Sequence, residues 1–189
     1  MNLKTTTSCP VCFKEMQLSW ETQEIPSFGE ALLIAGVCDC GFRYSDTILL
    51  NQKEPVRYTL QVNDPDDMDA RVIRSSSGTI RVPELGVNVE PGPASESYIS
   101  NVEGVLARIS EIVAFATRTA CEAGDAKGTS KGEEILENIR LALRGQFHLT
   151  FVIEDPLGNS AIASEKAVRS CLTDEEIASL KTGMIILDV

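Results

Sequence analysis

The chain has 189 residues, a formal net charge of −11 and a sequence pI near 4.6. Its length accommodates one medium domain with a small appendage, or two small domains. The acidic balance argues against a nucleic-acid partner, because proteins that neutralise phosphates carry a basic face. An acidic chain instead attracts and steers a basic protein partner.

The N-terminal segment contains four cysteines in two close pairs. Cys9 and Cys12 form a C-x-x-C pair, and Cys38 and Cys40 form a C-x-C pair after a spacer of 25 residues. Four thiolates hold Zn²⁺ in a tetrahedron, and a hairpin between the pairs would bring them together at little loop-closure cost. A segment of about 40 residues buries too little apolar surface to fold alone, so zinc binding and folding should be one event. The sequence therefore predicts a structural zinc finger over residues 1–52.

Two other interpretations of these cysteines fit the sequence less well. A redox C-x-x-C motif needs a preceding strand and a following helix, and residues 1–8 indicate neither. A zinc ribbon that binds nucleic acid conflicts with the charge of residues 1–52, which hold three basic and six acidic side chains, a net of −3. One zinc ion with four thiolates adds about −2. The finger's aromatic residues are expected to cover its small core rather than stack on bases. They are Phe13, Trp20, Phe28, Phe42 and Tyr44.

Short strand signals with frequent turns follow the finger. Residues 56–62 alternate apolar and polar side chains at period two, which predicts a half-buried strand. Turn formers fill 63–67, and strand-like segments at 70–74 and 79–82 are separated by the turn 75–78. We expect the latter two strands to pair with each other. This pattern is typical of a β-sandwich or barrel.

Two helices are predicted next. Two runs, 102–116 and 135–143, repeat apolar residues at helical spacing, and each begins near a capping box. Gly145 is well placed to end the second run. The loop 124–129 is short, which predicts an antiparallel helical hairpin at about 100–145. The capping boxes are Ser100-x-x-Glu103 and Ser130-x-x-Glu133.

Strand signals return at 147–153, and residues 155–158 have the composition of a type I turn. A short helix with a Thr173-x-x-Glu176 capping box is expected up to Leu180, followed by an apolar run at 184–187. The predicted fold class is mixed α+β, with the zinc finger in front of a β domain over 53–189 that contains the helical hairpin.

The remaining features concern compartment and thiol reactivity. Cys121 and Cys171 lie in apolar contexts and are expected to be buried, unreactive thiols. The first five residues lack the apolar region of a signal peptide, and no apolar run is long enough to cross a bilayer. We therefore expect a soluble cytoplasmic protein that makes no membrane contact.

An ordered set of seven phrases resembles the ZPR-type zinc-finger proteins, a family that binds translation elongation factor 1-alpha. Together the phrases span nearly the entire chain. They are Cys9-Pro10-x-Cys12, Ile25-Pro26-x-Phe28-x-Glu30, Cys38-x-Cys40-Gly41-Phe42-Arg43, Asp69-x-Arg71-Val72-x-Arg74-Ser75, Thr79-Ile80-Arg81-Val82-Pro83-Glu84-Leu85, Val102-Glu103-Gly104-Val105-Leu106 and Asp155-Pro156-x-Gly158-Asn159-Ser160.

The resemblance implies a zinc finger followed by a double-stranded β-helix domain, which is jelly-roll-like, with an inserted helical hairpin. It also implies a non-enzymatic role in which the protein binds elongation factor 1-alpha, during its folding or in control of its nucleotide state. Eukaryotic members resemble two tandem copies of this unit, whereas this chain holds one copy and resembles the archaeal form. The C-x-C pair and the missing second module depart from the eukaryotic pattern.

Five residues outside the finger are candidate partner contacts. Arg71, Arg74 and Arg81 are expected on one strand pair, where they would form a basic patch or pair with nearby carboxylates. Asp155 and Asn159 would shape a turn or contact the partner. Acidic clusters elsewhere could face a basic partner or be solvated.

No catalytic residue is predicted. A metal-dependent enzyme built on a β-barrel is the alternative class, and it would need clustered histidine and carboxylate ligands. The chain has one histidine, His148, which is expected to be packed or at a strand edge. Neither a Walker loop nor a G-x-S-x-G elbow is present in the sequence.

Overall fold

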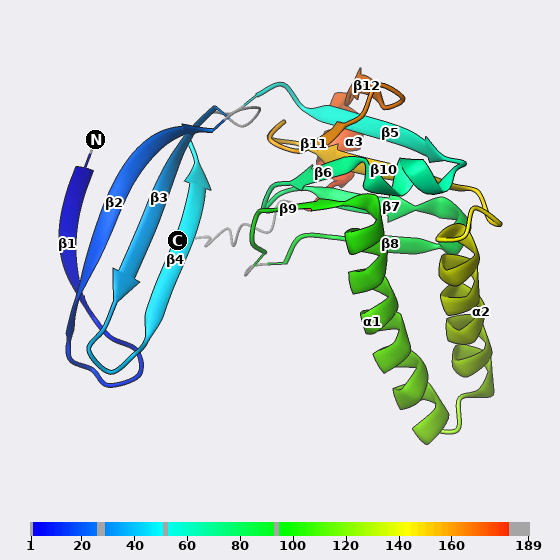
Figure 1. Ribbon diagram of the computed structural model, residues 1–189, viewed down its shortest axis with the longest axis horizontal. Coiled ribbons are helices and arrows are strands. Elements are labelled where there is room, and N and C mark those ends of the chain that lie inside the picture. The colour runs from blue at the N-terminus through cyan, green and yellow to red at the C-terminus, as the bar shows by residue number, and fades with distance from the viewer. Residues whose placement is uncertain (1, 26–28, 51–52, 93–94, 182–189) are drawn as a thin grey trace. The chain divides into compact units, whose positions relative to one another are not determined.

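The computed structural model describes residues 2–25, 29–50, 53–92 and 95–181. The chain divides into two compact units, Met1–Lys53 and Glu54–Val189 (Figure 1). The apolar run predicted at 184–187 and Phe28 lie outside the described residues. No described helix is long and apolar enough to span a membrane.

The first unit is an antiparallel sheet with the strand order β1-β2-β3-β4 (Figure 1). Because successive strands run in opposite directions, the β1–β2 and β3–β4 loops lie at the same end of the sheet. Each of these loops carries one cysteine pair, and the hairpin predicted between the pairs is β2 with β3. The strands are β1 (Asn2–Ser8), β2 (Glu15–Ile25), β3 (Gly29–Val37) and β4 (Arg43–Leu49).

The second unit contains two sheets, with strand orders β12-β5-β10-β7-β8 and β11-β6-β9. The period-two pattern predicted for 56–62 is confirmed, because Val56, Leu60 and Val62 are buried along β5. The strands are β5 (Val56–Val62), β6 (Arg71–Arg74), β7 (Thr79–Val82), β8 (Val87–Val89), β9 (Tyr98–Asn101), β10 (Leu149–Asp155), β11 (Ala161–Ala163) and β12 (Val168–Cys171).

The predicted pairing of β6 with β7 is wrong. Strand β6 pairs with β9 and β11, whereas β7 pairs with β8 and β10. The turn between them closes with a hydrogen bond from the N–H of Gly78 to the carbonyl of Ser75, at 3.1 Å, and carries the chain from one sheet to the other. Both strands are short and mostly buried, so their side-chain pattern does not identify a pairing partner.

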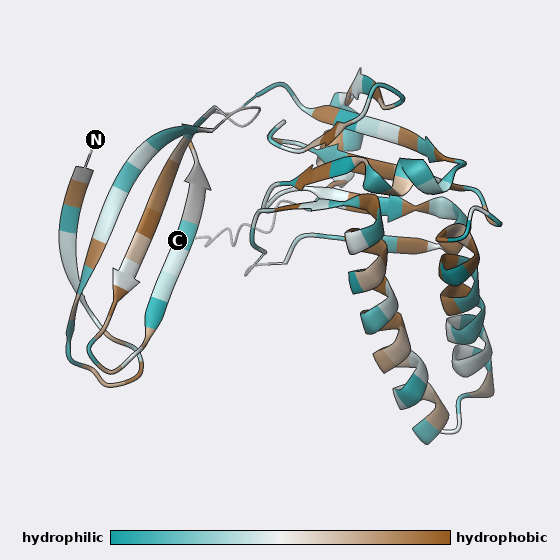
Figure 2. Ribbon diagram, viewed as in Figure 1, coloured by the Kyte–Doolittle hydropathy of each residue, from teal (hydrophilic) through white to brown (hydrophobic). Residues whose placement is uncertain are grey.

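The helical hairpin lies between β9 and β10 in the chain and is confirmed. It consists of α1 (Val102–Glu122) and α2 (Ala126–Ala142). Buried residues of α1 recur at helical spacing, namely Val102, Val105, Leu106 and Ile109. Figure 2 shows hydrophobic and hydrophilic residues mixed along both helices, as expected of helices with one packed face.

The predicted N-caps of both helices are wrong by one and five residues. Ser100 and Asn101 both belong to the β6–β9 ladder, so α1 begins at Val102, and the side chain of Asn101 caps it by accepting the N–H of Gly104 at 2.8 Å. The side chain of Asp125 caps α2 by accepting the N–H of Gly128 at 3.0 Å, so α2 begins before Ser130. Gly145 follows α2 with a positive φ of 69°, as predicted for the end of this helix.

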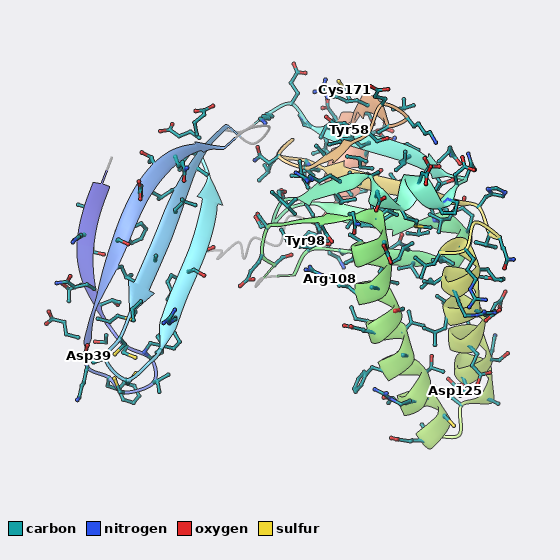
Figure 3. All side chains as sticks on the ribbon, viewed as in Figure 1. Asp39, Tyr58, Tyr98, Arg108, Asp125 and Cys171 are labelled. Carbon is teal, nitrogen blue, oxygen red and sulfur yellow. The ribbon has the colours of Figure 1, made fainter. Side chains whose placement is uncertain are left out.

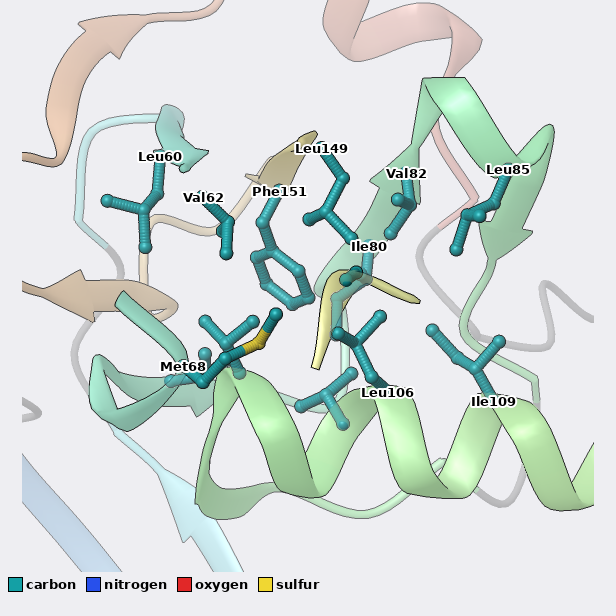
Figure 4. Close-up of a cluster of buried hydrophobic side chains, with 14 of the residues drawn as sticks. Leu60, Val62, Met68, Ile80, Val82, Leu85, Leu106, Ile109, Leu149 and Phe151 are labelled. Atoms are coloured by element: carbon teal, nitrogen blue, oxygen red, sulfur yellow. The ribbon is translucent and has the colours of Figure 1, made fainter. Parts of the chain in front are cut away.

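One hydrophobic core joins both sheets and the hairpin. Figure 4 shows Phe151 between the strands and α1, beside Leu106 and Val62. Phe151 and Leu106 are fully buried, so the core gains apolar burial from residues far apart in sequence. The single-turn helices η1 (Pro65–Asp69) and η2 (Pro83–Leu85) add Met68 and Leu85 to this core.

The C-terminal described element is α3 (Asp174–Ser179), and its predicted capping box is confirmed. The N–H of Thr173 donates to Glu176 Oε2 at 2.9 Å, and the N–H of Glu176 donates to Thr173 Oγ1 at 3.3 Å. Arg57 of β5 donates to Glu176 Oε1 at 2.8 Å, which ties α3 to the larger sheet.

Cys121 and Cys171 are exposed, so the expectation that they are buried is wrong. Cys121 lies near the end of α1, beyond the part of that helix that packs on the core. Cys171 lies on β12, a strand at the edge of the five-stranded sheet, whose side chains are all exposed (Figure 3).

A buried carboxylate connects two of the places where the chain crosses between the sheets, β6–β7 and β10–β11. Asp155 ends β10 and is fully buried. Its Oδ2 accepts the hydroxyls of Ser75 at 2.6 Å and Ser160 at 2.7 Å, and its Oδ1 accepts the hydroxyl of Ser77 at 2.7 Å. The first and third of these serines lie in the β6–β7 turn and the second precedes β11, so one side chain holds three segments together.

The turn predicted at 155–158 is present. The N–H of Gly158 donates to the Asp155 carbonyl at 3.2 Å. The N–H groups of Leu157 and Asn159 donate to the Asp155 carboxylate at 2.9 and 3.0 Å. The structure therefore gives Asp155 a clear structural role, in addition to its predicted role as a partner contact.

We expect Asp155→Ala to lower the free energy of unfolding of the second unit by about 3–5 kcal/mol, because several buried donors would lose their shared acceptor. Ser77→Ala removes one donor and should cost about 1 kcal/mol. Ser76→Ala is the matched control, since Ser76 is exposed in the same turn, and it should change stability by less than about 0.5 kcal/mol. Urea unfolding followed by far-ultraviolet circular dichroism measures all three. Equal stability of the Asp155→Ala and Ser76→Ala proteins would contradict the role given to this carboxylate.

Candidate metal centre

The four predicted zinc ligands lie together at one end of the finger. Their sulfur atoms are all within 4.8 Å of one another. Cys9 Sγ lies 3.7 Å from Cys40 Sγ, and Cys12 Sγ lies 3.5 Å from Cys38 Sγ. A tetrahedral zinc ion with Zn–S bonds of about 2.3 Å requires sulfur separations of about 3.8 Å. Figure 3 shows the sulfur atoms gathered near Asp39. The donor set and its spacing fit Zn²⁺ as the cofactor.

A tight turn forms the first half of the site. The N–H of Cys9 donates to the carbonyl of Lys14 at 2.8 Å, and the N–H of Phe13 donates to the carbonyl of Cys9 at 2.9 Å. Phe13, directly after Cys12, has a φ of 61°, a left-handed conformation that is uncommon for a bulky residue. The turn therefore has a strained backbone conformation, in which both sulfur atoms point toward the same position.

The second turn repeats the first with one residue fewer. The N–H of Cys38 donates to the carbonyl of Phe42 at 2.8 Å, and the N–H of Gly41 donates to the carbonyl of Cys38 at 2.9 Å. Gly41, directly after Cys40, has a φ of 92°. The C-x-C pair thus keeps the closing hydrogen bond and the left-handed residue of the C-x-x-C turn, and it still brings its sulfurs into the cluster.

The four thiols differ in burial. Cys9 and Cys38 are 0% and 3% exposed, whereas Cys12 is half-buried and Cys40 is exposed. Met16, with the partly buried Leu18 and Phe42, packs against the buried thiols. A closed set of four sulfur ligands leaves no open position for substrate, which is typical of a structural zinc site.

The thiols hold their protons unequally. Burial raises the pKa of Cys9, but hydrogen bonds from the backbone of the first turn outweigh burial and bring the pKa to about 7. The backbone N–H of Cys40 lowers the pKa of Cys38, yet burial and the neighbouring thiols outweigh it and raise the pKa to about 12. Despite a hydrogen bond from the backbone of Phe42, the pKa of Cys40 is also raised, since desolvation and neighbouring thiols prevail. The first thiolate forms easily and makes the next ones harder to form.

The three candidate arginines do not form one patch. Arg71 and Arg74 lie on β6 and Arg81 lies on β7, in different sheets, so the expected strand pair is wrong. Arg74 is buried and donates to the carbonyl of Gly78 at 2.8 Å. Arg81 pairs with the buried Glu154 at 2.7 Å, the cross-strand alternative considered for it. Arg71 is exposed.

The other candidate residues lie at structural positions. Asp155 and Asn159 are buried at the turn after β10. His148 directly precedes β10 and is exposed, so of the two environments expected for it the packed one is wrong. Sequence reasoning missed Glu154, which also accepts from Arg57 Nε at 2.8 Å, and it missed the serines around Asp155. The Ser75-Ser76-Ser77 run was a signal, but it was interpreted only as a turn.

Substitutions of the two residues with left-handed backbone conformations, Phe13 and Gly41, should have opposite effects on the stability of the finger. Phe13 is 81% exposed, so Phe13→Gly loses little packing and relieves a backbone cost of about 1–2 kcal/mol, offset in part by glycine's entropy. Gly41→Ala should destabilise the zinc-loaded finger by about 1–2 kcal/mol. An added methyl at Gly41 would meet nothing within 4 Å, so this cost is purely conformational. Chelator competition and thermal unfolding test both changes. If Gly41→Ala leaves the stability of the zinc-loaded finger unchanged, the strain argument is refuted.

Zinc binding should release at least two protons at neutral pH. Both Cys38 and Cys40 have a pKa raised above 9.0, so both are protonated near pH 7, and the metal must displace these protons. Zinc affinity should therefore fall by at least about a hundredfold per pH unit on acidification. Calorimetry in buffers of different ionisation enthalpy measures the proton count. Release of less than one proton per zinc ion would contradict this assignment.

Comparison with known proteins places the whole chain in one family. Residues 66–179 match the ZPR1 jelly-roll domain, so the predicted jelly-roll-like fold is confirmed. A ZPR1-like protein of Pyrococcus horikoshii is 40% identical over 185 residues, covering 95% of this chain and 82% of that protein. A ZPR1-like protein of Methanocaldococcus jannaschii is 40% identical over 184 residues, covering 96% of this chain and 91% of that protein.

Eukaryotic relatives are longer and less similar. The zinc finger chaperone zpr1 of Schizosaccharomyces pombe is 26% identical over 157 residues, covering 81% of this chain and 34% of that protein. The human zinc finger protein ZPR1 is 27% identical over 161 residues, covering 84% of this chain and 35% of that protein. This chain thus spans about a third of these relatives. It belongs to the ZPR1 family, as a zinc-binding, single-module member similar to the archaeal proteins.

Proposed function

We propose that this protein binds translation elongation factor 1-alpha and aids its folding or controls its nucleotide state, without catalysing a reaction. The closed cluster of four thiols is the observation that carries the proposal, because such a set stabilises a fold and offers no position for substrate. The name of the fission yeast relative, a zinc finger chaperone, supports a role with a protein partner.

In this proposal Cys9, Cys12, Cys38 and Cys40 are the zinc ligands, and the finger over residues 1–52 folds with its metal. The buried apolar residues described in the finger are the cluster of Cys9, Met16 and Cys38 together with Ala31 and Ile34, which is too small a core to hold four strands without the ion. The β domain over 53–189 has a hydrophobic core of its own and would remain folded after zinc is lost.

Charge supports a basic protein as the partner. The chain carries −11 at pH 7, and an elongation factor that carries aminoacyl-tRNA presents basic surface. Of the five candidate contacts outside the finger, Arg71 is the exposed one and could reach a partner directly. The other four residues would contribute indirectly, by stabilising the turns of the jelly roll and the surface around those turns. A partner of the translation machinery would place the protein in the cytoplasm.

The decisive experiment measures binding of the zinc-loaded protein to elongation factor 1-alpha from the same organism. GDP-bound, GTP-bound and nucleotide-free forms are compared at two salt concentrations. We expect binding that prefers one form and weakens with salt, because opposite charges on the two surfaces are screened.

Two cysteine variants control this experiment. Cys38→Ser removes a proposed zinc ligand and should weaken binding together with zinc content. Cys171→Ser changes an exposed thiol on an edge strand of the second unit and should leave both unchanged. Absence of binding in every nucleotide state would refute elongation factor 1-alpha as the partner and leave the family assignment intact.

A further inference from the structure

One face of the finger's sheet carries an open apolar groove beside the thiol cluster. The antiparallel register places Trp20 opposite Leu3 and Ile34, and it places Leu18 opposite Gly36, which in turn lies opposite Tyr44. Directly opposed residues share a face of a sheet. The groove has a volume of about 330 Å³. Its lining includes Met16, Leu18, Trp20, Ile34, Phe42 and Tyr44.

The indole of Trp20 presents an apolar surface in this groove. Its Nε1 donates to Thr5 Oγ1 at 2.7 Å, so the polar atom of the ring is satisfied within the sheet. The ring is half-buried, and none of the described strands of this unit lies over that face (Figure 1). The sequence predicted that Trp20 and Tyr44 cover the finger's core, but the described core cluster consists of other residues, around the thiols.

The side chains on the two faces of β2 differ in character. Alternate residues of β2 show the contrast, since Leu18 and Trp20 line the groove whereas Gln17 and Ser19 lie on the other face. Strand β3 is hydrophobic along much of its length in Figure 2, and it contributes Ile34 to the groove lining. An apolar groove on one face of a small sheet is typical of a site for a partner's side chain.

Charge near the groove selects the kind of partner. The groove lining contains no charged residue. Asp46 lies opposite Ile34 on the groove face, and its carboxylate accepts the hydroxyl of Tyr44 at 3.3 Å. Residues 1–52 carry a net of −3, and the zinc ion with four thiolates adds about −2. Apolar walls within an acidic surrounding suit an apolar side chain with cationic neighbours, and they repel a nucleic acid.

We propose that this groove binds one large apolar side chain of a partner protein, in a segment where lysines or arginines flank that side chain. The volume lies at the lower end of the range for ligand pockets, which suits a single phenylalanine or leucine rather than a cofactor. The apolar contact would supply the central buried anchor, and the acidic surrounding would steer the segment. This inference rests on the proposed function only in assigning the segment to elongation factor 1-alpha.

Trp20 gives a direct measurement, because it is the one tryptophan of the chain. The full zinc-loaded protein is titrated with a short tryptophan-free peptide that holds one phenylalanine between lysines and arginines. We expect a saturable change in tryptophan emission. The same peptide with alanine in place of phenylalanine, or with glutamates in place of the basic residues, should bind at least about tenfold more weakly. Unchanged emission with every peptide would overturn the proposal.

Two neighbouring residues of β4 provide a matched pair of variants. Tyr44→Lys and Ser45→Lys add the same charge on opposite faces of the sheet. Tyr44→Lys should weaken binding of the basic peptide at least about tenfold, and Ser45→Lys should weaken it less than about threefold. Zinc content confirms that each variant is folded, and Tyr44→Ala replaces Tyr44→Lys if that protein loses its metal. If both lysine variants lose affinity for the basic peptide equally, only net charge matters, and the proposed role of the groove is overturned.

Other occupants of the groove give different results. Acrylamide should quench Trp20 strongly in the free protein. Protection from acrylamide at every protein concentration would show that another part of the same chain fills the groove. Protection that appears only on concentration, with a doubled mass, would indicate a second copy of the protein. Either result overturns the proposal.

Binding of elongation factor 1-alpha to the wild-type and Tyr44→Lys proteins separates this inference from the proposed function. Equal binding to both proteins would refute the groove and leave the proposed function standing. Peptide binding without elongation-factor binding would support the groove and refute the proposed partner. Binding to wild type that weakens at least about tenfold in the variant supports both.

Discussion

The meeting of four thiols at one end of a four-stranded sheet is the constraint on which the finger depends. Two loops that are distant in sequence must converge there, and three buried residues, Cys9, Met16 and Cys38, form the local core. Zinc–thiolate bonds supply the stabilisation that such a small core lacks. The two turns solve the same geometric problem with different lengths, and both use a left-handed residue, Phe13 or Gly41, directly after the second cysteine.

Because the metal stabilises one end of the sheet, the rest of the sheet can be stable without a large hydrophobic core. One face therefore keeps Trp20 and Ile34 around an open groove rather than under a covering helix. A structural metal and a binding surface are then two consequences of one arrangement. In the proposed function, the acidic character of the finger would favour a basic partner by steering it before contact.

The second unit follows a different physical logic. Its sheets and hairpin share an apolar core, and the described part of its interior contains three buried carboxylates, Asp67, Glu154 and Asp155. Asp155 gathers hydroxyls and N–H groups from turns that cross between the sheets, whereas Glu154 lies beside it in β10 and pairs with Arg57 and Arg81. Buried charges of this kind must be fully paired, which restricts how the crossing turns can be arranged. Arg71 is exposed on the unit that these contacts hold together.

The sequence by itself determined the features that arise from local chemistry. The cysteine pairs identified the metal site, the period-two pattern of β5 identified a strand, and the 3.6-residue pattern of α1 identified the hairpin. Tertiary structure decided the rest. It placed β6 and β7 in different sheets, made Asn101 rather than Ser100 the cap of α1, and left Cys171 exposed on an edge strand. It also turned Trp20 into part of a groove. Periodicity and capping patterns report which face of an element is apolar, but strand pairing and burial depend on residues that are distant in the chain.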